Sequence, residues 1–101
     1  MYYLLVTTKY IKELTNILEM LWGIEKDLNL ISYNETEKKI YYIIAWHLDV
    51  HGNCNITDVI KNSGFSRSTV YKTIKKFESA HLVLIKQSQG DKREFNLYLS
   101  A

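Results

Sequence analysis

Residues 55–100 read NITDVIKNSGFSRSTVYKTIKKFESAHLVLIKQSQGDKREFNLYLS, and this stretch decides the fold. Thr57 and Ser66 carry hydroxyl side chains of the kind that cap helix N-termini. Gly64 lies between them, where a tight turn needs a residue of free backbone. We therefore expect a short helix from Thr57 and a second helix from Ser66, joined as a helix-turn-helix.

The second of these helices has one apolar face, made of Val70, Ile74 and Phe77, and it should run to about Ala80. Its opposite face is polar and basic. A helix of this kind fits the major groove of B-DNA, where residues near its N-terminus reach the base edges. The candidate DNA-binding residues on this recognition helix are Ser66, Arg67, Ser68, Thr69, Tyr71, Lys72, Lys75 and Lys76.

These candidates divide by position along the helix. Ser68, Thr69, Tyr71 and Lys72 lie where side chains read bases, whereas Lys75 and Lys76 are placed for the phosphate backbone. Arg67 fits a phosphate or a guanine edge equally well.

Two runs of alternating apolar and polar residues follow the helices, at 82–87 and 95–100. This alternation predicts two strands. The intervening turn residues are Ser88, Gln89, Gly90 and Asp91, so the strands should form a hairpin. A helix-turn-helix followed by a hairpin is a winged helix, which makes the expected fold mainly α with a small β-hairpin wing. At the wing tip, Lys92 and Arg93 suit a minor groove or flanking phosphates.

Upstream, Asn34 and Glu37 have the spacing of a capping box and predict a helix that ends before Gly52. Residues 8–32 predict a longer helix with an apolar residue every three to four positions, in heptads. Such a stripe suits dimerisation with a second copy of the chain. The candidate dimerisation residues are Tyr10, Leu14, Ile17, Leu21, Ile24 and Leu28. Residues 1–6 fit a strand or an extension of this helix.

Composition and charge agree with this reading. The chain has 101 residues, 47% of them hydrophobic and 24% charged, which is typical of one globular domain. We expect a single winged-helix domain over 1–101, with a dimerisation helix at 8–32 and a DNA-binding part at 34–100. The net charge is only +2, but residues 66–93 carry seven Lys and Arg against two acids. This local excess points to an anionic partner, with a solvated lysine-rich surface as the alternative.

The stretch from Asn34 to Ser100 resembles the DNA-binding lobe of MarR-type winged-helix regulators. In that family, the segment similar to residues 64–70 opens the recognition helix. The wing carries an Asp-x-Arg pattern, matched here by Asp91 and Arg93. The resemblance implies that Arg93 enters the minor groove and that Asp91 orients the basic side chains of the wing. MarR-type proteins continue into C-terminal dimerisation helices that this sequence lacks, so the N-terminal helix should carry the dimer.

The expected function is sequence-specific binding of double-stranded DNA at an inverted repeat by a homodimer that acts as a repressor or autoregulator. One alternative is a protein-interaction adaptor or antirepressor that recruits a partner through Tyr42, Trp46 and the N-terminal stripe. Another is a plasmid or viral partition or replication factor that binds DNA with the same fold. The sequence identifies no small-molecule effector.

Other site types find little support. His47, His51 and Cys54 have the residue types of a metal site, but no fourth ligand is evident, so no metal or cofactor is predicted. No nucleophile elbow or phosphate-binding glycine loop occurs, and we expect no enzyme activity. A lone cysteine, the lack of an apolar run near 18 residues and the lack of a signal-like start predict a cytoplasmic protein.

Overall fold

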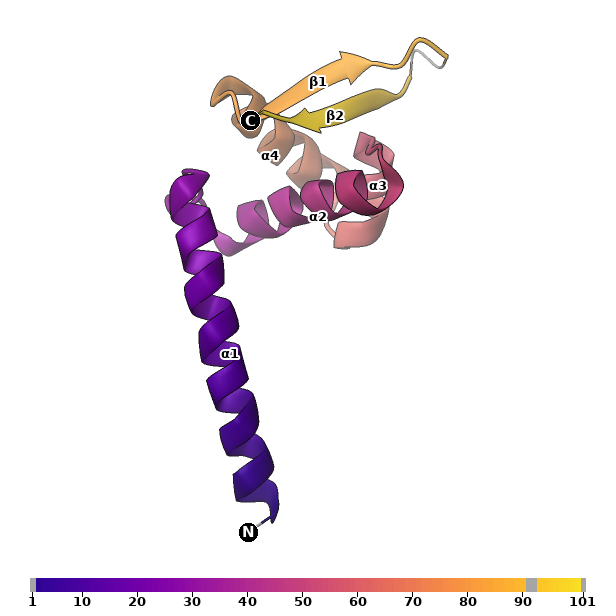
Figure 1. The fold of residues 1–101 in the computed structure, drawn as a ribbon. Helices are drawn as coiled ribbons and strands as arrows, with labels where there is room; N and C mark the ends of the chain where they lie inside the picture. Colours follow the sequence, from indigo (N-terminus) through magenta and orange to yellow (C-terminus); the bar gives the residue numbers. More distant parts are fainter. Residues whose placement is uncertain (1, 91–92, 101) are drawn as a thin grey trace. The chain divides into compact units, whose positions relative to one another are not determined.

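The computed structural model describes the backbone of residues 2–90 and 93–100, and the side chains from Thr7 onward within these ranges. The chain divides into two compact units, Met1–Asn34 and Glu35–Ala101. Within the described ranges the elements are, in order, α1 (Tyr2–Asp27), α2 (Glu35–His51), α3 (Ile56–Ser63), α4 (Arg67–Ser79), β1 (Val83–Gln87) and β2 (Phe95–Leu99) (Figure 1). The mainly α fold with a β-hairpin wing, a winged helix-turn-helix, is confirmed.

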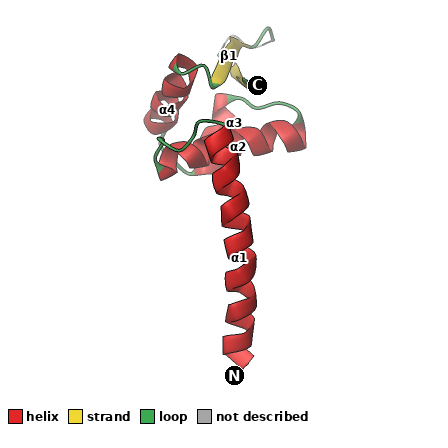
Figure 2. Cartoon of the chain, turned by 60° about the vertical axis from the view of Figure 1, so that its left-hand side comes forward, coloured by secondary structure: helices red, strands yellow, loops and turns green. Residues whose placement is uncertain are grey.

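The first unit consists of α1 and the turn that follows it, and α1 is one continuous helix (Figure 2). It begins earlier and ends earlier than the predicted 8–32, and residues 2–6 belong to it. Asn29 stops the helix because its backbone is left-handed, with φ of 60°. The amide of Asn29 donates to the carbonyl of Lys26 (3.2 Å) and that of Leu30 to the carbonyl of Glu25 (2.8 Å), which is a Schellman motif. No helix in the described ranges is long and apolar enough to cross a lipid bilayer.

The second unit begins with α2, directly after Asn34 as predicted. Ile40 and Ile44, one turn apart, are fully buried, and Tyr41 beside them is 4% exposed. The helix contacts α3, α4 and β2. It ends at His51, and Gly52 follows with a left-handed backbone (φ 78°).

The cap of α3 is Asn55, so the prediction of Thr57 was wrong. The side chain of Asn55 accepts a hydrogen bond from the backbone N–H of Asp58 (2.8 Å), and the carboxylate of Asp58 accepts one from the N–H of Asn55 (3.1 Å). This reciprocal pair is a capping box with Asp at its third helical position. Because this pair satisfies the amides of Asn55 and Asp58, the helix starts one residue after Asn55.

The turn between α3 and α4 matches the sequence prediction. Gly64 ends α3 with φ of 75°, a conformation that costs little only for glycine. Ser66 caps α4, and its hydroxyl accepts a hydrogen bond from the amide of Thr69 (3.2 Å).

The hairpin pairs β1 and β2 antiparallel, with Val83 opposite Leu99 and Gln87 opposite Phe95. A short bridge between Asn55 and Asn96 adds the backbone just before α3 to the edge of β2. There the amide of Leu97 donates to the carbonyl of Cys54 over 2.7 Å. The wing is thereby joined directly to the start of the helix-turn-helix.

One core holds this unit together. Every element of the unit contributes to it, and the buried apolar residues are Ile40, Tyr41, Ile44, Cys54, Ile56, Val59, Val70, Ile74, Phe77, Val83 and Leu97. The three residues predicted for the inner face of α4 are among them, each at most 1% exposed. This burial fixes which face of α4 remains for a partner.

Candidate nucleic-acid interface

The face of α4 opposite the core is exposed and basic. Ser68, Lys72 and Lys75 follow one another at helical spacing and are all exposed. No acidic residue occurs in the first two turns of the helix. The structure therefore brings together, on one rod, three of the residues predicted to meet DNA.

The N-terminus of α4 holds a hydroxyl cluster. Ser66 donates to the hydroxyl of Thr69 (2.9 Å), and its oxygen lies 3.3 Å from that of Ser68. Ser66 and Thr69 are thus engaged in capping, although both were predicted to contact DNA. Ser66 and Ser68 are exposed, whereas Thr69 is half-buried.

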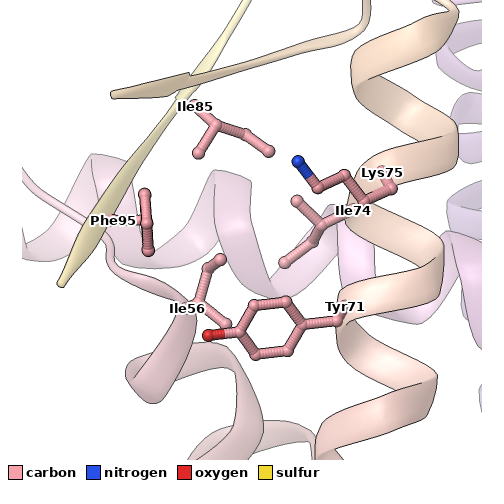
Figure 3. A pocket seen from close by; sticks show the side chains of 6 residues that line it. All are labelled: Ile56, Tyr71, Ile74, Lys75, Ile85 and Phe95. Carbon is pink, nitrogen blue, oxygen red and sulfur yellow. The ribbon is translucent and has the colours of Figure 1, made fainter. Parts of the chain in front are cut away.

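Arg67 and Tyr71 form one edge of the helix. The guanidinium carbon of Arg67 lies 6.0 Å from the centroid of the Tyr71 ring, within the range of a cation–π contact. Tyr71 also helps to line a cavity of about 210 Å³ between α4 and the hairpin. The six side chains shown around it are Ile56, Tyr71, Ile74, Lys75, Ile85 and Phe95 (Figure 3). Tyr71 is therefore half-buried, and it connects the recognition face to the wing.

The two lysines predicted to contact the phosphate backbone differ in their surroundings. Lys75 is exposed and lies 3.6 Å from Glu78 on the same helix, a weak surface pair. The ammonium of Lys76 instead donates to the carboxylate of Glu37 on α2 over 2.7 Å. Sequence reasoning missed this partner because the two residues are 39 positions apart.

The wing tip is described only in part. Arg93 is exposed on the turn of the hairpin, on the wing as expected. Asp91 and Lys92, the other wing residues predicted from the sequence, lie outside the described residues. The amide of Ser88 donates to the carbonyl of Glu94 (2.9 Å) and closes the base of the turn.

The base of the wing is tied to α3 by a side-chain contact that sequence reasoning also missed. The amide group of Asn55 donates to the carboxylate of Glu94 over 3.2 Å. The same residue therefore caps α3 and contacts the residue just before β2, the second strand of the wing. The capping box that begins at Asn55 can be recognised in the sequence, but its contact with Glu94 cannot.

The histidine and cysteine candidates have structural surroundings. The ring nitrogen Nδ1 of His47 lies 2.7 Å from the carbonyl of Asn53, so it is the donor in this bond. Nε2 of His47 is 3.8 Å from Asp58. Cys54 is buried, and burial followed by the negative charge of Asp58 raises the pKa of its thiol to about 12. Among the described residues no group of three or more metal-binding side chains comes together.

The predicted dimerisation residues lie on α1. Four are exposed, namely Tyr10 (62%), Leu14 (55%), Ile17 (62%) and Ile24 (46%), while Leu21 and Leu28 are partly exposed. In the described part of its unit, α1 is the only helix or strand, so no second element of that unit covers the stripe. Ile11, Met20 and Trp22 are exposed as well, so the apolar surface of α1 is wider than one heptad seam.

Several solved structures share this fold. NadR in complex with 4-hydroxyphenylacetate matches with a TM-score of 0.61 and 18% identity, over 95% of this chain and 63% of its own. MarR matches with a TM-score of 0.57 and 12% identity, over 86% and 64%. A MepR–DNA complex from S. aureus matches with a TM-score of 0.57 and 21% identity, over 90% and 64%. The chain thus spans less than two thirds of the length of each of these structures.

No protein-family model matches the chain. No curated protein matches it either. At the identities found, the solved structures establish the fold, which is the winged helix-turn-helix of MarR-type regulators.

Proposed function

We propose that the chain is a sequence-specific DNA-binding transcriptional regulator that acts as a homodimer, most simply as a repressor or autoregulator. The observation that carries the proposal is the exposed face of Ser68, Lys72 and Lys75 on the second helix of a helix-turn-helix, whose first two turns contain no acidic residue. A helix with this face enters the major groove, and the exposed amides at its N-terminus favour phosphate. The fold is shared with MepR, whose structure contains DNA.

In this proposal the residues have different tasks. Ser68 and Lys72 meet base edges, together with Tyr71, which lines the cavity beside the hairpin, and Arg67, which lies against the Tyr71 ring. Lys75 contacts the phosphate backbone, and Ser66 and Thr69 shape the helix start. Arg93 and Lys92 extend the contact to a minor groove or to flanking phosphates, with Asp91 orienting them.

The proposed dimer forms through the apolar stripe on α1. Apolar side chains that are about half exposed on a monomer commonly mark an interaction surface. A second copy of α1 supplies the same stripe, so a two-fold pair covers both. Two recognition helices related in this way would bind half-sites about 34 Å apart, which is one turn of DNA, on an inverted repeat. DNA as the target agrees with the cytoplasmic location expected from the sequence.

The test is selection of bound sequences from a random duplex pool, followed by binding titrations at several salt concentrations. Lys72→Ala should weaken binding to the selected site, because it removes a contact from the centre of the exposed face. If Lys72 also neutralises a phosphate, the slope of log K against log salt should fall by about 0.9. Lys9→Ala removes the same charge from α1 and should leave the affinity unchanged. Equal binding by Lys72→Ala and the unmodified chain would place the DNA surface elsewhere.

One observation favours a second candidate function, a protein-interaction adaptor. Trp46 and Val50 are 53% and 54% exposed, one turn apart on α2. An adaptor would use this patch, and its lysines would be ordinary surface residues. It would not bind duplex DNA at physiological salt, so the same titration separates the two candidates.

A further inference from the structure

Lys76 of α4 contacts Glu37 of α2, and this contact has no part in the DNA binding proposed above. The ammonium nitrogen lies 2.7 Å from the carboxylate oxygen, a short charge-assisted hydrogen bond. The side chain of Glu37 is 11% exposed and that of Lys76 is 55% exposed. The acid is thus held in place by the fold, and the lysine reaches across to it.

The ammonium of Lys76 is already bound to Glu37, so it is poorly placed to bind a DNA phosphate. To bind DNA its ammonium would have to leave Glu37, which would break a charge-assisted hydrogen bond to a nearly buried carboxylate. While the contact persists, the fields of the two opposite charges largely cancel at distances greater than the 2.7 Å between them. The positive field of α4 then comes from Lys72 and Lys75, together with Arg67 at its N-terminus.

The same contact restrains the orientation of α4. The next residue, Phe77, packs edge-on against Tyr41 of α2, with ring centroids 5.9 Å apart. Close packing of the apolar face sets the rotation of α4, and the directed hydrogen bond at the edge of that face adds a second restraint on it. Lys76 lies one turn after Lys72 and next to Lys75, so a rotation of α4 about its axis would displace both exposed lysines.

We propose that Glu37 and Lys76 are positioning residues, which fix the rotation of α4 so that Ser68, Lys72 and Lys75 point together at the DNA. This inference rests on the proposed DNA-binding function. It assigns Lys76 a different role from the phosphate contact expected from the sequence. It also brings Glu37, a residue of α2, into the function of the recognition helix.

The first experiment measures DNA binding by Glu37→Gln and Lys76→Met in the full chain, on the selected site and on random duplex. Each variant should lose about tenfold in affinity for the selected site and much less for random duplex, with the salt slope unchanged. The double variant should bind about as well as each single variant, because both remove one interaction. The exchange E37K/K76E should bind more tightly than K76E alone.

Glu35→Gln is the matched control, because Glu35 is on the same helix but is 95% exposed and forms a local pair with Lys38, three residues away. It should bind like the unmodified chain. If Lys76→Met lowers the salt slope by about 0.9 while Glu37→Gln changes nothing, Lys76 contacts phosphate and the inference is wrong. Equal losses on selected and random DNA would also overturn it, because they would reflect stability and not orientation.

The second experiment needs no DNA. Hydrogen exchange of the amides of α4 should be about tenfold faster in Glu37→Gln than in Glu35→Gln, since one restraint on the helix is gone. If the unmodified chain binds no duplex, the proposed function fails, and this measurement still decides whether the pair holds α4. Equal exchange in the two variants would show that it does not.

Discussion

Cys54 illustrates how surroundings decide what a reactive residue type can do. Its side chain is 1% exposed, and its sulfur lies 3.7 Å from the carbonyl of Asn55. Burial and the nearby Asp58 raise its pKa to about 12 because both disfavour the thiolate. The thiolate is the nucleophilic form, so the fold suppresses the chemistry that a lone cysteine otherwise suggests.

The thiol should therefore resist alkylation in the folded protein. With a pKa of about 12, about one thiol in ten thousand is ionised at pH 8, so iodoacetamide should react at the rate of unfolding or local opening. Labelling followed by mass spectrometry checks this with and without urea, and urea should accelerate it strongly. As a control, Cys54→Ser combined with Asn62→Cys moves the thiol to an exposed position on α3 and should react at once. Rapid labelling of the native protein would contradict the buried thiol.

The sign of the pH effect follows from the same shift. The thiol ionises in the unfolded chain at lower pH than in the folded one. Its contribution to stability is therefore complete below the unfolded pKa and is lost as pH rises toward about 12. Burial also raises the pKa of Tyr41, which acts in the same direction. Alkaline conditions should thus destabilise the second unit.

Among the elements, α3 depends most clearly on a single residue. Asn55 accepts a hydrogen bond from the amide of Asp58 and donates one to Glu94, so it connects the helix to the wing. Asn55→Ala should lower the free energy of unfolding by about 1–2 kcal/mol, the usual value of a lost cap. Urea denaturation measures this effect. Asn55→Asp keeps the cap but places a second carboxylate beside Glu94, and its loss should be smaller.

A partner exchange tests the wing contact separately. In Asn55→Asp combined with Glu94→Gln, the new amide can donate to the new carboxylate, so hydrogen exchange in β2 should return toward that of the unmodified protein. If Asn55→Asp is as unstable as Asn55→Ala, the contact with Glu94 matters more than the cap. If all three variants match the unmodified chain, neither bond contributes.

The elements also show what sequence reasoning can and cannot reach. Three features were predicted correctly because each depends on nearby residues alone. They are the Ser66 cap, the turn at Gly64 and the inner face of α4, which follows from the spacing of its apolar residues. The start of α3 was misplaced because Asn55 and Thr57 are both good caps, and the choice depends on Asp58. The partners of Lys76 and Asn55 lie 39 residues away, so no local pattern announces them.

At the scale of the whole molecule, charge is divided between the parts. Residues 1–52 carry seven acids against five lysines, whereas residues 53–101 carry eight basic residues against four acids. The nearly neutral total therefore hides a basic C-terminal half, whose local excess of positive charge favours an anionic partner. Apolar surface is also concentrated, in the stripe on α1. In the proposed function, the basic surface binds DNA and the apolar stripe on α1 binds a second copy of the chain.

That division predicts that dimerisation can be removed without unfolding the DNA-binding part. Ile17 is 62% exposed in the stripe, so Ile17→Glu should leave the fold intact but place a charge in the α1 interface, and analytical ultracentrifugation should find a monomer. Lys12→Glu adds the same side chain to the opposite face of α1 and should remain dimeric.

The monomer should bind a half-site as the unmodified chain does, yet lose its preference for an inverted repeat, because that preference comes from joining two recognition helices. If Ile17→Glu remains a dimer, the interface lies elsewhere. If the unmodified chain is a monomer, the stripe on α1 binds a partner other than a second copy.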